Sequence, residues 1–413
     1  MNYILNVKKI NLKFLLQLLY CLIPASLITG SFFPDLIVSL ISALFLFSCF
    51  REGKFSYFNN KFFLFFFLFY LILILSSLIN NSIFNNSIIF YIRFGIFIVA
   101  ASYLIEIDKK FINMLFIITF LTFLLLCLDS YFQYFFGTNI SGNAYPGIYI
   151  YDYPRLNSFF GKEYKLGSFI VRLLPFLIFV FLIYARASKF ILCALLLLLS
   201  GLVFLSGERS SLLLLIVIIF FLFFFNRFYF LVSLFSLLVL FFLLYNFSSL
   251  KGYKTRVIDL TSLIYSTNVN TKETTGSLIK NPLSLLNHEY KSIYTNSFRI
   301  FKDNPFFGSG PKSYRVECKK YDSKACTTHP HQTYLQLLSE VGLFGFLFVL
   351  FIFFYSIFSY FKNIKSSSYV SFIYLGIIIN IWPLTSSGNF FNNWLSVIIF
   401  FPLGFLLINK EKI

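Results

Sequence analysis

Long apolar stretches recur from one end of the chain to the other, and only short polar segments separate most of them. A helix needs about 20 apolar residues to cross the hydrocarbon core of a bilayer. The sequence is 58% hydrophobic and 12% charged, whereas soluble domains carry about 25% charged residues. The chain is therefore predicted to be an all-α polytopic membrane protein.

A minimum length of about 20 apolar residues per span predicts about twelve transmembrane helices along the chain. They are predicted over residues 12–30, 33–50, 62–79, 87–105, 111–129, 166–185, 189–206, 209–226, 228–246, 338–361, 369–384 and 390–408. Residues 1–246 would carry all the spans before the large loop at 247–337, and 338–413 would carry the rest. A smaller outer loop is expected at about 130–165. The first span is long enough to remain as an anchor.

The distribution of positive charge predicts the orientation. With the N-terminus in the cytoplasm, every inner segment is basic, and the outer segments "SFF", "NNSIFNN" and "TSSGNF" lack Lys and Arg. The positive-inside rule then places both termini in the cytoplasm. The rule also accounts for much of the formal charge of +18, so no nucleic-acid partner is expected. The basic inner residues are Lys8, Lys9, Lys13, Arg51, Lys54, Lys61, Lys109, Lys110, Arg186, Lys189, Arg227, Lys362, Lys365, Lys410 and Lys412.

The large outer loop contains a segment with helical spacing, "LNHEYKSIYTNSFRIFKDNP". The Asn304-Pro305 pair should end this helix. Two placements remain open: the helix lies on the membrane surface, or it belongs to a small folded loop domain. The apolar positions are Leu286, Tyr290, Ile293, Tyr294, Phe298 and Phe301, and the basic ones are Lys291, Arg299 and Lys302.

Two cysteines, Cys318 and Cys326, lie in the same outer loop. An oxidising compartment permits a disulfide between them, if the geometry allows it. A zinc site with His329 and His331 is the alternative, although the spacing lacks the C-x-x-C of structural zinc sites. The cysteines that fall within spans are predicted to be apolar filler, and these are Cys21, Cys49, Cys127 and Cys193.

Three arginines are predicted in the outer third of the membrane: Arg93, Arg172 and Arg209. The first two are about six residues into their spans, roughly 9 Å below the outer surface. Charge at this depth is costly and usually functional. A cationic pocket for a lipid-linked diphosphate is one interpretation, because guanidinium binds phosphate oxygens in a bidentate way. Snorkelling to the interface is a second. A third is pairing with a carboxylate at similar height: Asp129, Glu163 or Glu208.

Four segments resemble the O-antigen ligase and O-antigen polymerase superfamily of bacterial inner-membrane glycosyltransferases. They are "RLNSFFGKEYKLGSFIVRLLP" at 155–175, "SGERSSLLL" at 206–214, "RIFKDNPFFGSGPKSYR" at 299–315 and "HPHQTYLQLLSEVGLFG" at 329–345. Their order and their placement relative to the predicted spans make the combination more specific than any one of them. The resemblance implies an all-helical fold of the C type with a large helical periplasmic loop.

The resemblance also implies a chemistry. The donor would be a glycan on undecaprenyl diphosphate, used without a cofactor or a metal. His331 matches the family's loop histidine, with Gln332 following where the family often has Asn. Arg209 matches the arginine at the start of the eighth span, and either Arg155 or Arg172 matches a second one. The other residues considered for the site are Arg93, which the motifs do not cover, and the supporting residues His329, Arg299, Arg315 and Glu340.

Two of the three histidines in the chain lie at one junction, His329 and His331, just before a predicted membrane helix. A histidine with a pKa of about 6.5 can accept a proton near neutral pH. His331 is therefore predicted to activate the acceptor hydroxyl, while arginines stabilise the leaving diphosphate. The alternative for both residues is capping of the following helix. His288, on the loop helix, is predicted to be solvated.

The predicted function is glycan transfer to an acceptor hydroxyl at the outer face of the inner membrane. Lipid A-core is the first acceptor considered, which would make the protein an O-antigen ligase. A repeat-unit polymerase would use another lipid-linked glycan, and a third option is transfer to a protein hydroxyl. A polysaccharide transporter is the alternative from another class, but it would need polar residues near the bilayer midplane. The midplane portions are almost wholly Leu, Phe and Ile.

Overall fold

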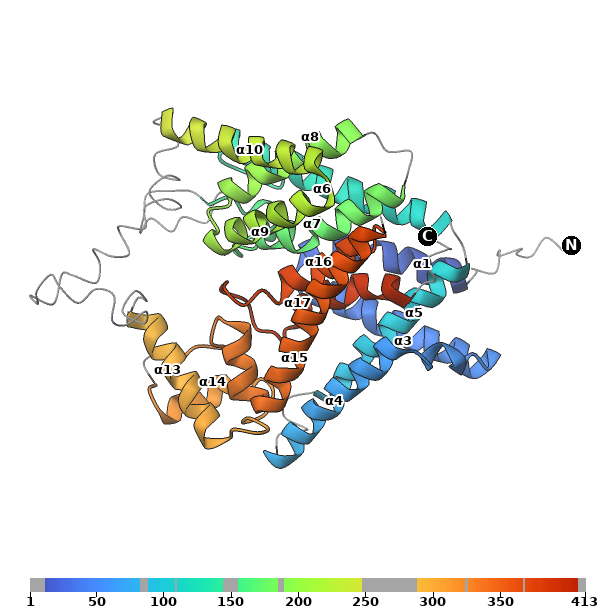
Figure 1. Ribbon diagram of the computed structural model, residues 1–413, viewed down its shortest axis with the longest axis vertical. Coiled ribbons are helices and arrows are strands. Elements are labelled where there is room, and N and C mark those ends of the chain that lie inside the picture. Colours follow the sequence, from blue (N-terminus) through green and yellow to red (C-terminus); the bar gives the residue numbers. More distant parts are fainter. Residues whose placement is uncertain are drawn as a thin grey trace, which may run out of the picture.

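The computed structural model describes residues 12–81, 88–107, 110–143, 155–184, 189–246, 288–323, 326–366 and 368–407. Across these ranges the chain is helical and forms no β-strand (Figure 1). Residues 247–287 of the predicted loop at 247–337, and residues 144–154 of the predicted loop at 130–165, fall outside the described residues. The all-α class is confirmed.

The helices of the first half carry most of the predicted early spans. They are α1 (Leu12–Cys21), α2 (Ile23–Ser26), η1 (Leu27–Thr29), α3 (Phe32–Glu52), η2 (Phe55–Phe58), α4 (Lys61–Ile79), η3 (Ile88–Tyr91), α5 (Ile92–Ile107), α6 (Lys110–Phe136), η5 (Ser158–Phe160), α7 (Leu166–Ile183), α8 (Lys189–Leu205), α9 (Arg209–Phe225) and α10 (Arg227–Asn246).

The second half begins with a loop helix and ends with three apolar elements. The bounds are α13 (His288–Asp303), α14 (Tyr314–Glu317), η8 (Cys318–Lys320), α15 (Thr333–Lys365), α16 (Ser371–Asn380), α17 (Asn393–Phe400) and η9 (Phe401–Leu407). The Asn304-Pro305 pair follows the end of α13, as predicted.

Six of the described helices are long and apolar enough to cross a membrane, and a bent pair at Leu12–Cys21 and Ile23–Thr29 makes a seventh if it counts as one span. The other predicted spans coincide with shorter apolar helices of 10–17 residues. α6 extends to Phe136, so the outer loop predicted from about residue 130 starts later. The chain is a polytopic helical membrane protein.

Burial separates central helices from peripheral ones. In the apolar stretch of α7, 83% of the residues are buried inside the protein, against 28% in that of α4. α16 is also buried along nearly its whole length, and α7 packs beside it, with α15 on the other side of α16 (Figure 1). The exposed Leu and Phe side chains of α4 and α15 suit contact with lipid, where an apolar surface has no cost.

The loop helices α13 and α14 pack together beside the first turns of α15 (Figure 1). Ile293, Ile300, Tyr314 and Cys318 form a small buried cluster that is separate from the main core. This cluster favours the folded loop domain over a helix that only lies on the membrane. Tyr290 and Phe298 on α13 are exposed, so two apolar positions of the predicted surface helix do face outward.

Candidate active site

α15 is broken at Gly342, where φ is +72° and ψ is −165°. A break leaves backbone groups without partners within the helix. The loop after α13 supplies these partners on both sides of the break. Leu343 N–H donates to Pro305 O at 2.8 Å, and Gly310 N–H donates to Glu340 O at 2.9 Å. The neighbouring pairs are Ser309 N–H to Ser339 O and Phe344 N–H to Phe306 O.

The docked loop needs glycine on both sides of the contact. A Cβ on Gly308 would lie 2.4 Å from the Glu340 carbonyl carbon, and one on Gly342 would lie 2.4 Å from that of Phe306. Both glycines also have positive φ. α4 supports the same loop, because Ser76 Oγ donates to Phe307 O at 2.6 Å. The motifs "NPFFGSG" and "EVGLFG" therefore form one structural unit.

His329 precedes α15 and has both ring nitrogens engaged. Nε2 lies 3.2 Å from Ser387 O, and Nδ1 lies 2.9 Å from Thr328 Oγ1. Because a carbonyl only accepts, Nε2 carries the proton and Nδ1 accepts from the threonine hydroxyl. Burial, together with the neighbouring His331, lowers the pKa of His329 to about 4. His329 is therefore neutral near pH 7 and held in one orientation.

His331 packs against His329 with ring centroids 4.2 Å apart, and Tyr290 lies 6.3 Å away. Its backbone has a φ of +58°, and its carbonyl accepts from Ser387 N–H at 2.9 Å. Within the described part of the chain, neither ring nitrogen of His331 has a hydrogen-bond partner. Burial lowers its pKa, so the ring is neutral at pH 7 with one nitrogen available as an acceptor.

The residue that caps α15 is Gln332. Its side-chain Oε1 accepts from Leu335 N–H at 2.6 Å, and its Nε2 donates to Pro383 O at 2.9 Å. The capping function considered for the two histidines is thus carried by the next residue.

The segment 380–394, which runs from the last residue of α16 to the second residue of α17, connects the histidines to the rest of the site. Four side chains at the start of α15, including its cap, form hydrogen bonds with this segment. Gln332 donates to Pro383 O, Thr333 to Ser387 Oγ, and Tyr334 to Ile381 O. Gln336 donates to Asn389 Oδ1 and accepts from Phe390 N–H. From the sequence, "TSSGNF" is predicted only to be a short outer segment without Lys or Arg. Its density of Ser and Asn was the available signal for a hydrogen-bonded role.

Arg172 on α7 is 5% exposed and reaches the start of the same segment. Its Nη1 donates to Asn380 Oδ1 at 3.1 Å and to Asn380 O at 3.2 Å, and its Nε donates to Ser168 Oγ at 3.0 Å. These hydrogen-bond acceptors are all neutral, so the guanidinium keeps its charge without a direct carboxylate partner among the residues described.

The Glu208 carboxylate binds the first turn of α7 and lies near Arg155. Its carboxylate accepts from Gly167 N–H at 2.9 Å and Ser168 N–H at 3.0 Å. Burial raises its pKa, against the opposing effect of these donors and of Arg155. Arg155 donates to Ser206 O at 3.2 Å and covers the Tyr164 ring, and the exposed Arg209 follows Glu208 directly.

Arg93 has a different environment. It forms a salt bridge with Asp35, with Nη2 2.6 Å from Oδ1, and also donates to Asn393 Oδ1 at 3.3 Å. The sequence analysis considered pairing for this arginine but with other carboxylates. Asp129 instead accepts from Ile140 N–H and Ser158 Oγ, and Glu163 pairs with Lys165.

The three other supporting residues differ in burial: Glu340 is buried, whereas Arg299 and Arg315 are exposed. Glu340 is fully buried, accepts from Tyr314 N–H at 3.1 Å and Gln336 Nε2 at 2.9 Å, and so joins the docked loop to α15. Arg299 and Arg315 are exposed on the loop helices. Lys312, which the sequence analysis did not single out, is half-buried. Burial, and then Arg93 and Arg315, lower its pKa.

The two loop cysteines form a disulfide, with Cα atoms 5.3 Å apart. The alternative zinc site would need both as thiolates, which the bond prevents. No group of three His, Cys, Asp or Glu side chains suited to a metal occurs within the described ranges. Cys21, Cys49, Cys127 and Cys193 are free and buried, as predicted.

Residues 193–350 match the family model described as O-antigen ligase. The matched range contains three of the motifs noted in the sequence, with Arg209 and both histidines. It excludes the segment at 155–175 and the segment at 380–394. No curated protein gives a significant match to the chain. The family match and the apolar helices support O-antigen ligase or polymerase-type glycan transfer by a multi-pass inner-membrane protein.

Proposed function

We propose that this chain, whose residues 193–350 match the O-antigen ligase family model, transfers a glycan from undecaprenyl diphosphate to an acceptor hydroxyl. The reaction takes place at the histidine end of α15. The acceptor is the lipid A-core of lipopolysaccharide. No metal or cofactor takes part.

The observation that carries this proposal is the protonation, burial and hydrogen bonding of the His331 ring. Its ring is neutral, half-buried and packed on a second histidine, and no described residue occupies its nitrogens. A general base needs this combination of an open lone pair and a fixed position. His329 supplies the fixed position, since Ser387 and Thr328 hold its ring.

In the proposed step, the acceptor oxygen attacks the anomeric carbon while His331 takes the hydroxyl proton. The bond between the anomeric carbon and the diphosphate oxygen breaks, and the diphosphate leaves with the electron pair. Attack opposite to the leaving group inverts the anomeric centre. The histidinium then releases its proton to water, which restores the base.

Arginine stabilises the leaving diphosphate. Arg172 is the strongest candidate because its hydrogen-bond partners are neutral and it reaches the same 380–394 segment as His329. Arg209 and Arg155 lie around Glu208, one turn of α7 away from Arg172. Arg93 is the weakest candidate, because Asp35 already neutralises its charge.

The membrane orientation of this proposal puts both termini in the cytoplasm, with about twelve spans and the histidines on the periplasmic side. A single cysteine at Ile140 should react with a membrane-impermeant maleimide added to intact cells from outside, and one at Ser366 should not. Labelling at Ser366 but not at Ile140 would show that the protein has the opposite orientation in the membrane.

Two other acceptors use the same donor site: a second lipid-linked repeat unit, or a protein hydroxyl. Deletion of the gene separates the ligase from the polymerase. Loss of all O-antigen from lipid A-core supports the ligase, and retention of one repeat unit supports the polymerase. A polysaccharide transporter would need polar groups at mid-membrane, whereas the interior of α7 beyond Arg172 is apolar.

A further inference from the structure

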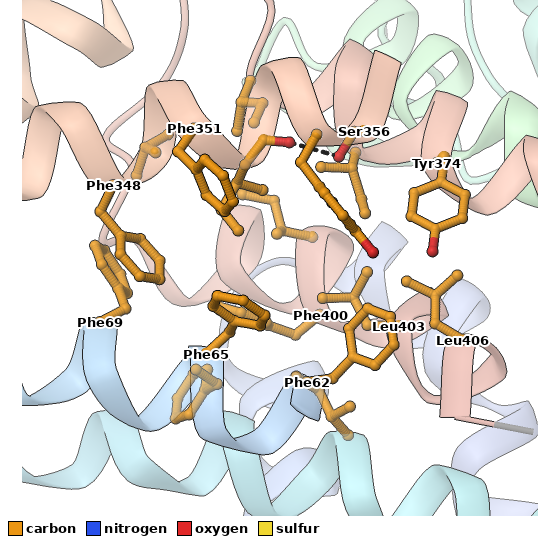
Figure 2. A pocket seen from close by; sticks show the side chains of 18 of the residues that line it. Phe62, Phe65, Phe69, Phe348, Phe351, Ser356, Tyr374, Phe400, Leu403 and Leu406 are labelled. Carbon is orange, nitrogen blue, oxygen red and sulfur yellow. Dashed lines mark hydrogen bonds between the residues drawn. The ribbon is translucent and has the colours of Figure 1, made fainter. Parts of the chain in front are cut away.

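A cavity of about 210 Å³ lies between α4, α15, α16 and η9, and neither His329 nor His331 lines it. Figure 2 shows Phe65 and Phe69 of α4 facing Phe348 and Phe351 of α15, with Tyr374 at the other end. Almost all of its lining is aromatic or aliphatic. This apolar lining suits a hydrocarbon chain.

The cavity reaches the lateral surface of the protein. Two of the lining side chains, Phe65 of α4 and Phe351 of α15, are 39% and 51% exposed, and their rings contact each other with centroids 6.2 Å apart. α4 is the least buried of the long membrane helices. A chain from the surrounding bilayer can therefore enter between α4 and α15 without passing through water.

A second cavity of about 200 Å³ continues from the first and has a different lining. Both cavities share Tyr355, Tyr374 and Leu406; Lys61 lines the first, and the second adds the polar residues Ser359, Lys362 and Asn363. Lys362 is exposed and forms no ion pair with any residue that the structure describes. The combined site is apolar along its length and cationic at one end.

The cationic end lies at the membrane face opposite the histidines. α15 starts beside His331, and about 20 residues separate its break at Gly342 from Lys362. At 1.5 Å per residue this distance is roughly 30 Å, the thickness of a bilayer core. A diphosphate near the histidines cannot also contact Lys362.

We infer that this joint site binds an anionic glycerophospholipid from the leaflet opposite the histidines. One acyl chain occupies the aromatic cavity, and the phosphate lies at Lys362. A Lys near an anionic lipid contributes about 1 kcal/mol, which corresponds to roughly fivefold in affinity. This inference does not depend on the proposed transfer chemistry.

The test uses the purified full-length protein in detergent, titrated with phosphatidylglycerol and followed by native mass spectrometry. Lys362→Gln should weaken binding roughly fivefold. Lys365→Gln is its matched control, because Lys365 is exposed on the same helix and lines neither cavity. Ile352→Trp should fill the aromatic cavity and also weaken binding. Ile357→Trp, half-buried on α15 but outside the cavities, controls for added bulk.

The inference requires phosphatidylglycerol to bind more tightly than phosphatidylcholine and both test variants to bind less than their controls. It is overturned if all four variants bind phosphatidylglycerol alike, or if phosphatidylcholine binds equally well. Displacement of phosphatidylglycerol by undecaprenyl phosphate at equal concentration would also overturn it, because the cavity would then belong to the donor's isoprenoid chain. Thermal unfolding of each variant in the same detergent shows whether it is folded.

Discussion

Gly342→Ala tests whether the broken helix holds the site together. An alanine at φ +72° and ψ −165° lies in a region that only glycine normally occupies, which costs about 1–3 kcal/mol. The new Cβ would also lie 2.4 Å from the Phe306 carbonyl carbon, so the docked loop must move away. Each of the four backbone hydrogen bonds across this contact contributes about 1 kcal/mol. We expect a loss of about 3 kcal/mol or more in the free energy of unfolding.

The assay is thermal unfolding of the purified protein in one detergent, with transfer activity measured on the same preparation. Gly376→Ala is the control, because Gly376 is helical and its nearest neighbour to a new Cβ is Pro175 Cβ at 3.9 Å. That change should leave stability unaltered or raise it by about 1 kcal/mol. If Gly342→Ala unfolds at the same temperature as Gly376→Ala, the contact between the loop and the break does not contribute the expected free energy of unfolding.

Three further predictions concern the proposed chemistry. Arg172→Ala should abolish transfer in protein that still inserts into the membrane, because it removes both the charge and the links to Ser168 and Asn380; normal turnover would exclude Arg172 from donor binding. Arg209→Lys should also transfer poorly, since a point charge cannot replace a bidentate fork, and full activity would indicate that charge alone suffices. Transfer should be lost as pH falls through the lowered pKa of His331, because only the neutral ring accepts a proton. A wild-type profile of transfer rate against pH that falls on its acid side above the ordinary histidine pKa of about 6.5 contradicts this.

The apolar runs predicted where helices occur, because the thickness of the bilayer fixes how long a spanning helix must be. They did not predict the break inside the span at 338–361. Glycine is tolerated within helices, and the break at Gly342 depends on a loop that begins some 37 residues earlier, at Pro305. The sequence therefore contained both motifs but not their contact.

The candidate site shows a similar division. The rarity of histidine and its position before α15 singled out His331, and the depth of Arg172 singled out that arginine. The partner of Arg93 could not be predicted, because Asp35 lies 58 positions away along the chain. The 380–394 segment was overlooked because most of its role is carried by backbone carbonyls and amide side chains, whose partners depend on the folded arrangement.

The most direct test of the central claim is transfer in reconstituted membranes with purified lipid-linked donor and acceptor. His331→Ala should lose about 10²-fold or more in rate, the usual scale for a general base, while donor binding survives. His329→Ala should be much milder, because its ring only positions its neighbour. An inactive His329→Ala with an active His331→Ala would assign the base to the other histidine, and full activity in both would contradict the catalytic role of this pair.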